Sequence, residues 1–173
     1  MTRALSMRRF GRVVVLASIA LTCARPSRQA EDQGLEAVIQ QYLDADTGGN
    51  VYAANSLADW RECEWVPSTD MQEPVSAAAV VRTERFADSA VVWLHYRVLG
   101  RSSGGTFVAE ARDDTVRVLL LRVDGSYRIQ CGDFHPNHPG VAAFERGWLS
   151  ALDSISTVSW RRAREDAKTS DQK

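Results

Sequence analysis

Several features that would identify a chemistry are missing from this sequence of 173 residues. It has no glycine-rich phosphate loop, no nucleophile elbow and no order of Ser, His and Asp that indicates a catalytic triad. Basic residues are not in excess, since 21 Lys and Arg stand against 22 Asp and Glu. Nucleic-acid phosphates are normally met by a basic face, so we expect no nucleic-acid partner.

The apolar stretch near the start of the chain is also too short to span a membrane. Residues 13–21 (VVVLASIAL) are nine uncharged, mostly apolar residues, whereas a transmembrane helix needs roughly 20. Four arginines precede this stretch, and Thr22, Cys23 and Ala24 follow it. A basic start, a short apolar stretch and small residues are typical of an export signal. We therefore expect the protein to leave the cytoplasm.

The end of this signal has more than one interpretation. Residues 20–23 (ALTC) resemble a bacterial lipoprotein signal, in which Cys23 would be acylated and become the new N-terminus. Ordinary signal-peptidase cleavage is the alternative, because small residues stand one and three positions before a cut after Ala20 or Ala24. An uncleaved N-terminal anchor is the third. We expect a location in the bacterial envelope, periplasm or exterior, with membrane contact only through the N-terminal anchor.

Only three cysteines are present, and the lipoprotein interpretation uses one of them. Disulfides persist outside the cytoplasm, so we expect Cys63 and Cys131 to be bonded. Closing that loop would contribute roughly 4 kcal/mol in the chain-entropy model. Two buried free thiols are the alternative, since reduced Cys packs as a small hydrophobe. Without residues 1–22 the chain would keep 17 basic and 22 acidic residues, a formal charge of −5.

The sequence predicts an export signal at 1–23, a polar tether at 24–33, one domain at 34–160 and a charged flexible tail at 161–173. Near the start of the domain, apolar residues at helical spacing predict an amphipathic helix, and these are Leu35, Val38, Ile39, Tyr42 and Leu43. A second stripe predicts a last helix, with Val141, Phe144, Trp148, Leu152 and Ile155 on one face.

Strands are predicted between these helices. Residues 75–86 and 90–99 are rich in β-branched and aromatic types, and in the second run alternate residues line one buried face: Ala90, Val92, Leu94, Tyr96 and Val98. Strands at 116–123 and 126–131 flank Asp124-Gly125, a dipeptide typical of type I′ hairpin turns. Residues 100–105 (GRSSGG) predict a flexible loop.

Two stretches, 38–46 (VIQQYLDAD) and 118–129 (VLLLRVDGSYRI), resemble the nuclear-transport-factor-two-like superfamily, also called SnoaL-like or cystatin-like. The resemblance implies a bent antiparallel sheet wrapped around helices into a cone with an apolar pocket. The expected fold is therefore α+β, with a curved antiparallel sheet packed on an N-terminal helix and with an additional C-terminal helix. That last helix lies outside the minimal family pattern.

Enzymes of this superfamily place an Asp or an Asp–His pair inside the cone, and no residue here matches such a motif. The candidates are His95 and Asp59, which could abstract a proton if they were buried and within hydrogen-bond reach. His135 and His138 belong to ligand types that zinc uses, but their spacing matches no established site. Two prolines exclude regular structure at 133–140, so we expect an exposed loop there. We expect neither a metal nor a cofactor in this protein.

Aromatic residues offer the best candidates for a ligand pocket. They could stack on a ligand, although aromatic residues more often fill the core of a small domain. The candidates are Tyr42, Trp60, Trp65 and Trp93. The sequence thus favours a non-catalytic role, in which the concave sheet face binds a small apolar ligand or another envelope protein. The alternative is a cofactor-independent lyase or isomerase with an Asp/His acid–base pair in the cone.

Overall fold

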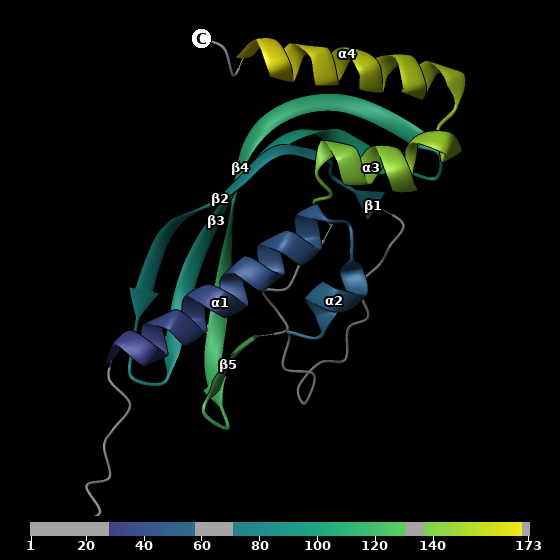
Figure 1. Cartoon of the computed structure of the whole chain (residues 1–173). Helices are drawn as coiled ribbons and strands as arrows, with labels where there is room; N and C mark the ends of the chain where they lie inside the picture. The colour runs from purple at the N-terminus through teal and green to yellow at the C-terminus, as the bar shows by residue number, and fades with distance from the viewer. Residues whose placement is uncertain (1–27, 58–70, 131–136, 171–173) are drawn as a thin grey trace, which may run out of the picture.

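The computed structural model describes residues 28–57, 71–130 and 137–170. Within them, α-helices pack on one curled antiparallel sheet (Figure 1). The predicted fold class is confirmed: α+β, with a curved antiparallel sheet, an N-terminal helix packed on it and a C-terminal helix. The elements are α1 (Arg28–Thr47), α2 (Val51–Asn55), β1 (Met71–Gln72), β2 (Val75–Arg85), β3 (Ser89–Ser103), β4 (Thr106–Val123), β5 (Ser126–Ile129), α3 (Val141–Gly147), the 3₁₀ turn η3 (Leu149–Ala151) and α4 (Ser154–Ser170).

The long strands β3 and β4 form the centre of the sheet. They pair in antiparallel fashion from Ser89 with Leu121 to Ser103 with Thr106. The other side of β3 pairs with β2 and, near its end, with β1, while β5 pairs with the end of β4. Among the described strands β2 pairs with β3 alone, so β2 forms an edge of the sheet.

The sheet bends where β3 passes Gly100. The register between β3 and β4 shifts between Val98 and Gly100, and such a bulge bends a strand and increases its twist. A Cβ atom at Gly100 would overlap the backbone oxygen of Val108 and lie 2.7 Å from the ring of Phe107. Glycine permits this close approach, so this position lets the two strands curl together and divides the sheet into two halves.

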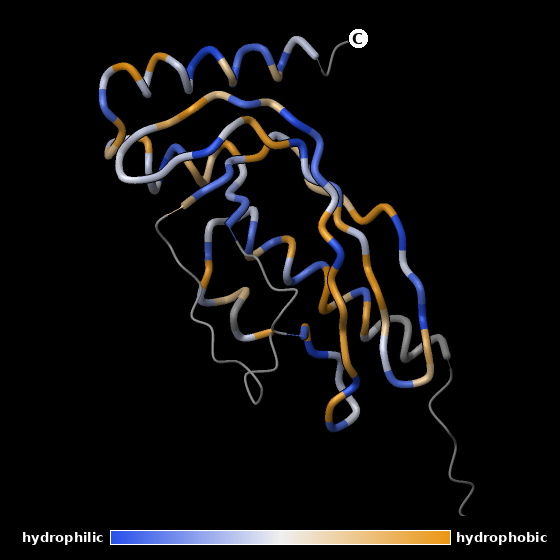
Figure 2. The backbone as a smooth tube through the Cα atoms, turned by 180° about the vertical axis from the view of Figure 1, so that it is seen from behind, coloured by the Kyte–Doolittle hydropathy of each residue, from blue (hydrophilic) through white to orange (hydrophobic). Residues whose placement is uncertain are grey.

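One half of the sheet, which contains the residues of β3 before Gly100 and their partners on β4, packs on α1. As the stripe predicts, the helix buries Leu35, Ile39, Tyr42 and Leu43 and half-buries Val38. The strand β3 alternates as predicted too, with Ala90, Val92, Leu94, Tyr96 and Val98 buried in the same core. Figure 2 shows hydrophobic stretches along the strands where they pass α1.

The other half, which contains the end of β3 and the start of β4, packs on α3 and α4 around Trp160, which is fully buried. Its ring meets Phe107 edge-on at 5.3 Å and Phe144 at 4.6 Å between centroids. Ala163 is buried and Ala167 packs beside it. These small residues, at helical spacing after the tryptophan, continue the packed face of α4 as far as Ala167. The helix itself extends to Ser170, so residues 161–170 are helical where the sequence predicted a flexible tail.

The single last helix predicted from one apolar stripe is wrong. The helix α3 ends at Gly147, and α4 begins at Ser154 after the η3 turn. The carboxylate of Asp153 accepts a hydrogen bond from the Ser156 backbone N–H at 2.7 Å, which starts a new helix with its own orientation. The hydrogen bonds with Ser156 lower the pKa of Asp153. Ile155, predicted to lie on the buried stripe, is 78% exposed.

Glycine stands in two of the hairpin turns, one of them predicted and the other unexpected. Asp124 and Gly125 have φ angles of 52° and 82°, as a type I′ turn requires, which confirms the predicted hairpin. The flexible loop predicted at 100–105 is wrong for most of its length, because β3 continues to Ser103. Gly104 and Gly105 alone, with φ angles of 55° and 82°, turn the chain into β4.

Candidate functional site

A groove lies between α1 and β2, which run antiparallel to each other. A cavity of about 490 Å³ separates the C-terminal part of α1 from the first half of β2, and a second of about 330 Å³ continues beside it toward Arg85. Gln40 and Val80 line both cavities, so the two form one groove. Its larger apolar lining residues include Leu35, Ile39, Leu43, Val75, Val80 and Val92, and polar residues such as Thr47 and Ser76 line the first cavity beside them.

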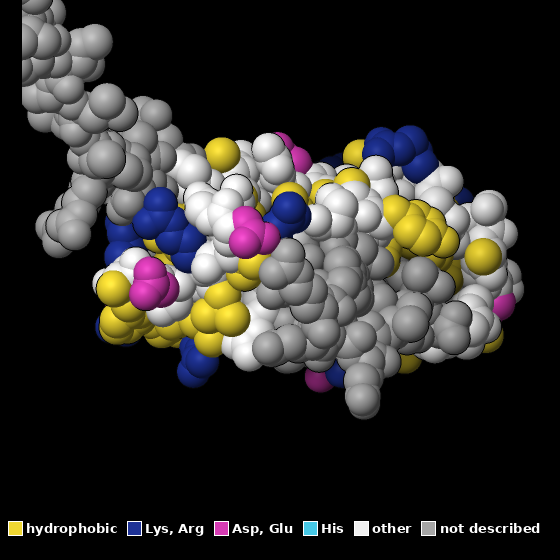
Figure 3. All heavy atoms as spheres, turned by 90° about the horizontal axis from the view of Figure 1, so that it is seen from below, with side chains coloured by type: hydrophobic (Ala, Val, Ile, Leu, Met, Phe, Trp, Pro, Cys, Tyr) yellow, Lys and Arg dark blue, Asp and Glu magenta, His cyan; other side chains and the backbone are white. Residues whose placement is uncertain are grey.

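Polar groups stand along the α1 side of the groove. The exposed carboxylate of Asp44 accepts a hydrogen bond from Gln40 Nε2 at 2.8 Å. At the other end, Glu36 Oε1 lies 3.6 Å from Arg85 Nη2 on β2. On the face seen from below, Figure 3 shows hydrophobic side chains beside basic and acidic ones. The groove therefore suits a ligand that carries both apolar and polar groups.

A second feature is a polar cluster buried in the interior, made of Asp46, Tyr96 and His138, which are 2%, 0% and 5% exposed. The Tyr96 hydroxyl donates to Asp46 Oδ2 at 3.0 Å, and His138 Nδ1 lies 3.1 Å from the same oxygen. The backbone N–H of His138 donates to Asp46 Oδ1 at 2.9 Å. The rings of Tyr96 and His138 stack with centroids 4.1 Å apart.

Charged groups continue this cluster toward the surface. His138 Nε2 lies 3.9 Å from Glu73 Oε2, which in turn lies 2.7 Å from Arg112 Nη2. Glu73 Oε1 also lies 3.3 Å from Arg101 Nε. Burial, followed by the negative charge of Asp46, raises the pKa of Tyr96 far above its ordinary value. Tyr96 therefore stays a protonated donor throughout the physiological range.

The geometry of the buried cluster indicates a structural role. Asp46 lies on α1, Tyr96 on β3 and His138 in the segment before α3, so one carboxylate joins three separate parts of the chain. Both oxygens of that carboxylate already accept hydrogen bonds. Asp46 and His138 do not belong to the described lining of the groove. The prediction that 133–140 forms an exposed loop is wrong at His138, because this pairing draws the residue into the core.

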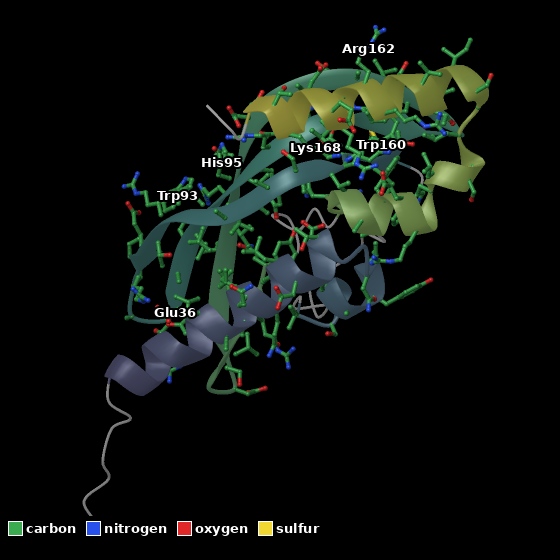
Figure 4. The ribbon with its side chains drawn as sticks, turned by 45° about the horizontal axis from the view of Figure 1, so that its top comes forward. Glu36, Trp93, His95, Trp160, Arg162 and Lys168 are labelled. Atoms are coloured by element: carbon green, nitrogen blue, oxygen red, sulfur yellow. The ribbon has the colours of Figure 1, made fainter. Side chains whose placement is uncertain are left out.

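The outer face of the sheet, opposite α1, carries another His–Asp pair. His95 Nε2 on β3 lies 3.3 Å from Asp113 Oδ1 on β4, with side chains 33% and 68% exposed. On the same face, the guanidinium of Arg82 lies 4.7 Å from the ring centroid of Trp93. Figure 4 shows Trp93 and His95 on the strands, away from Glu36 of α1.

The structure separates the residues that the sequence proposed for a site. Tyr42 is buried on α1, where its side chain contributes to the raised pKa of Tyr96. Trp93 and His95 alternate with the buried residues of β3 and so lie on the opposite face of the sheet. The other candidates fall outside the described residues: Asp59, Trp60, Trp65, the pair Cys63 and Cys131, Cys23 and His135.

The sequence analysis missed the interior pair of Asp46 and His138. A signal for Asp46 was present, because it continues the apolar stripe of α1 three residues after Leu43 and four after Tyr42. A carboxylate on the buried face of a helix needs a partner. His138 stands beside a proline in a segment without periodicity, so no local pattern pointed to its burial.

Two further properties concern metals and membranes. Within residues 28–57, 71–130 and 137–170, no three His, Cys, Asp or Glu side chains gather closely enough to hold a metal ion. In the same part of the chain, no helix combines the length and hydrophobicity that crossing a bilayer requires.

Comparison with known proteins gives little. No protein-family model matches the chain, and no curated protein matches it. One similar solved structure is described as "An enumerative algorithm for de novo design of proteins with diverse pocket structures". It is 13% identical and aligns over 56% of this chain and 95% of its own, with a TM-score of 0.31. A similarity of this size does not establish a family.

Proposed function

We propose that this chain is an exported binding module of the nuclear-transport-factor-two-like type, which holds a ligand in the groove between α1 and β2. The curled antiparallel sheet around α1 is compatible with the cone of that superfamily. The observation that carries the proposal is the groove itself, two joined cavities of about 490 and 330 Å³. Ligand sites are typically concave and largely apolar, with a few polar groups.

A non-catalytic role is favoured over the lyase or isomerase alternative. An acid–base pair must reach the proton that it transfers. In the described groove lining, the titratable side chains are Glu36, Asp44 and Arg85, and two of these are already paired with each other. The buried Asp46 and His138 are bonded to one another and do not line the groove. Binding without chemistry therefore agrees best with these contacts.

The test is binding of the neutral apolar dye Nile red to the purified protein, followed by fluorescence. Val80 lines both cavities and is 44% exposed, so Val80→Trp should fill the groove and weaken dye binding by about tenfold. Val108→Trp is the matched control, since Val108 is also a strand valine and is 63% exposed. Equal dye affinity in both variants, or none in the parent protein, contradicts the proposal.

The proposed location is the bacterial envelope, with Cys23 acylated. Its support is the order of arginines, apolar residues and small residues at 1–23. The intact mass of the protein from a membrane fraction tests this, because an acylated Cys23 has a lipid mass and a free N-terminus after Ala20 or Ala24 does not. In the same sample, alkylation in denaturant without reductant tests the proposed bond between Cys63 and Cys131, since free thiols then react and bonded ones do not.

A further inference from the structure

We infer that the ligand of the groove is an extended peptide segment of a partner protein, which adds to the sheet along the edge of β2 that faces away from β3. This inference rests on the proposed function and specifies the class of ligand. Strand addition to a sheet edge is a common mode of peptide recognition, in which main-chain hydrogen bonds give affinity and side-chain pockets give specificity.

The first observation is that β2 lies at an edge of the described sheet. In the described part of the chain, β2 pairs with β3 on one side and has no strand beside it on the other. Edge strands are usually protected by charges, bulges or proline. The register of β2 with β3 shifts between Val75 and Ala77 and between Val80 and Arg82, so residues 77–80 form a regular stretch between the two shifts. The charges of β2 are confined to its end, at Arg82, Glu84 and Arg85. The stretch 77–81 (AAAVV) carries none, and Val80 and Val81 are 44% and 57% exposed.

The second observation is that this edge already binds one extended segment of the same chain. The backbone N–H of Glu73 donates to the Asn137 oxygen at 2.8 Å, and that of Val75 donates to the Pro139 oxygen at 3.0 Å. Val75 and Gly140 form a parallel bridge. Gly140 then donates to the Thr47 oxygen at 2.8 Å, and the chain turns away into α3.

The groove begins at the point where this internal segment leaves the edge. Gly140 and Val141 line the first cavity together with Val75. A peptide that enters there, parallel to β2, would continue the row of hydrogen bonds that Asn137 and Pro139 begin. From Ala77 to Glu84 the strand offers roughly 25 Å of edge at about 3.3 Å per residue, which is enough for a segment of about seven residues.

The groove wall specifies which side chains the peptide should carry. Alternate residues of a strand point to the same face, so one set would face α1. At the start of the groove this set meets the exposed carboxylate of Asp44, which favours Lys or Arg. Farther along it meets Ile39, Val80 and Val92, which favour apolar side chains. The expected motif is a basic residue followed, at alternate positions, by apolar ones.

The probe is the capped peptide Thr-Lys-Thr-Val-Thr-Val-Thr, measured by displacement of Nile red and by calorimetry with the purified protein. Its Lys and two Val share one face. We expect N-methylation of one alternate set of amides to weaken binding by about tenfold and methylation of the other set to have little effect, because only one set faces β2. A permuted peptide, with Lys and Val on opposite faces, should bind more weakly, and Asp44→Asn should weaken the original peptide but not Nile red.

The outcomes separate the inference from the proposed function. If Nile red binds in the groove but the peptide does not displace it, or if both N-methylated sets bind equally, strand addition is wrong and the groove remains a small-ligand site. If neither dye nor peptide binds, both proposals fail. A third outcome is a dimer in analytical ultracentrifugation that Val80→Trp abolishes and Val108→Trp preserves. The edge would then be covered by a second copy of this chain, which overturns the inference.

Discussion

Two His–Asp pairs with nearly the same contact distance occupy very different parts of this molecule. His138 Nδ1 lies 3.1 Å from Asp46 Oδ2 in the interior, and His95 Nε2 lies 3.3 Å from Asp113 Oδ1 on the outer face. The side chains of the first pair are 6% and 0% exposed, and those of the second are 33% and 68% exposed. Contact distance alone therefore says little about how much a polar interaction contributes to the free energy of unfolding.

The difference lies in what replaces each contact when it is lost. Water can solvate His95 and Asp113, so breaking their contact leaves neither group unsatisfied. Water does not reach Asp46 and His138 in the same way, and an unpaired buried polar group costs the full free energy of its desolvation. Asp46 also holds Tyr96, so the interior pair joins three segments of the chain whereas the outer pair joins two adjacent strands.

The largest effect that tests this comparison is expected for Asp46→Ala. The substitution removes the acceptor of the Tyr96 hydroxyl, of the His138 backbone N–H and of the His138 ring. A buried donor left without its acceptor typically costs about 1–3 kcal/mol, and this substitution leaves more than one. We expect the free energy of unfolding, measured by urea titration with circular dichroism, to fall by at least about 3 kcal/mol.

Asp44→Ala is the matched control on the same helix. Asp44 is exposed, and its carboxylate accepts a hydrogen bond from the exposed side chain of Gln40, one helical turn earlier. A surface substitution of this kind usually changes the free energy of unfolding by less than about 0.5 kcal/mol. Similar losses in the two variants would contradict a special role for the buried carboxylate.

A smaller effect is expected for Tyr96→Phe, together with a distinctive pH dependence. Loss of a hydrogen bond to a charged group should lower the free energy of unfolding at neutral pH by about 2 kcal/mol. Burial, followed by the charge of Asp46, raises the pKa of Tyr96 in the folded protein above its ordinary value of 10.0. The stabilisation that Tyr96 provides is therefore complete below about pH 10, where both states keep the proton, and declines at higher pH, where only the unfolded state releases it.

The measurement is urea unfolding of parent and variant between neutral pH and the alkaline range. One proton of difference corresponds to about 1.4 kcal/mol per pH unit above the unfolded pKa. Parent stability should thus fall more steeply than that of Tyr96→Phe. Parallel curves would mean that Tyr96 ionises equally in both states. Tyr52→Phe, at an 85% exposed position, should behave like the parent.

The sequence predicted the fold well because its signals were local and periodic. The stripe on α1, the alternation along β3 and the Asp124-Gly125 turn each depend on a few neighbouring residues. Burial of Tyr42 and Tyr96 also followed from this periodicity. The length of β3 did not, because Gly100 and Ser103 are typical of loops and lie in the strand through pairing with β4 and, at Ser103, also with β1.

The candidate site was less predictable because its parts meet only in three dimensions. His95 was a candidate catalytic residue in a clearly predicted strand. The alternation that buries Leu94 and Tyr96, however, turns His95 to the outer face of the sheet. The pairing of Asp46 with His138 joins residues 92 positions apart. The groove, likewise, depends on how α1 lies against β2, which no local pattern in either element specifies.

The smallest effect is expected for the outer pair. Asp113→Asn keeps the shape of the side chain and removes its charge, next to His95 at 3.3 Å and Arg97 at 3.8 Å. Exposed ion pairs contribute about 0.2–1 kcal/mol, and screening by salt lowers this further. In a double-mutant cycle with His95→Gln, urea unfolding should give a coupling free energy below about 0.5 kcal/mol. A coupling as large as the loss caused by Asp46→Ala would mean that contact geometry, and not burial, determines the strength of both pairs.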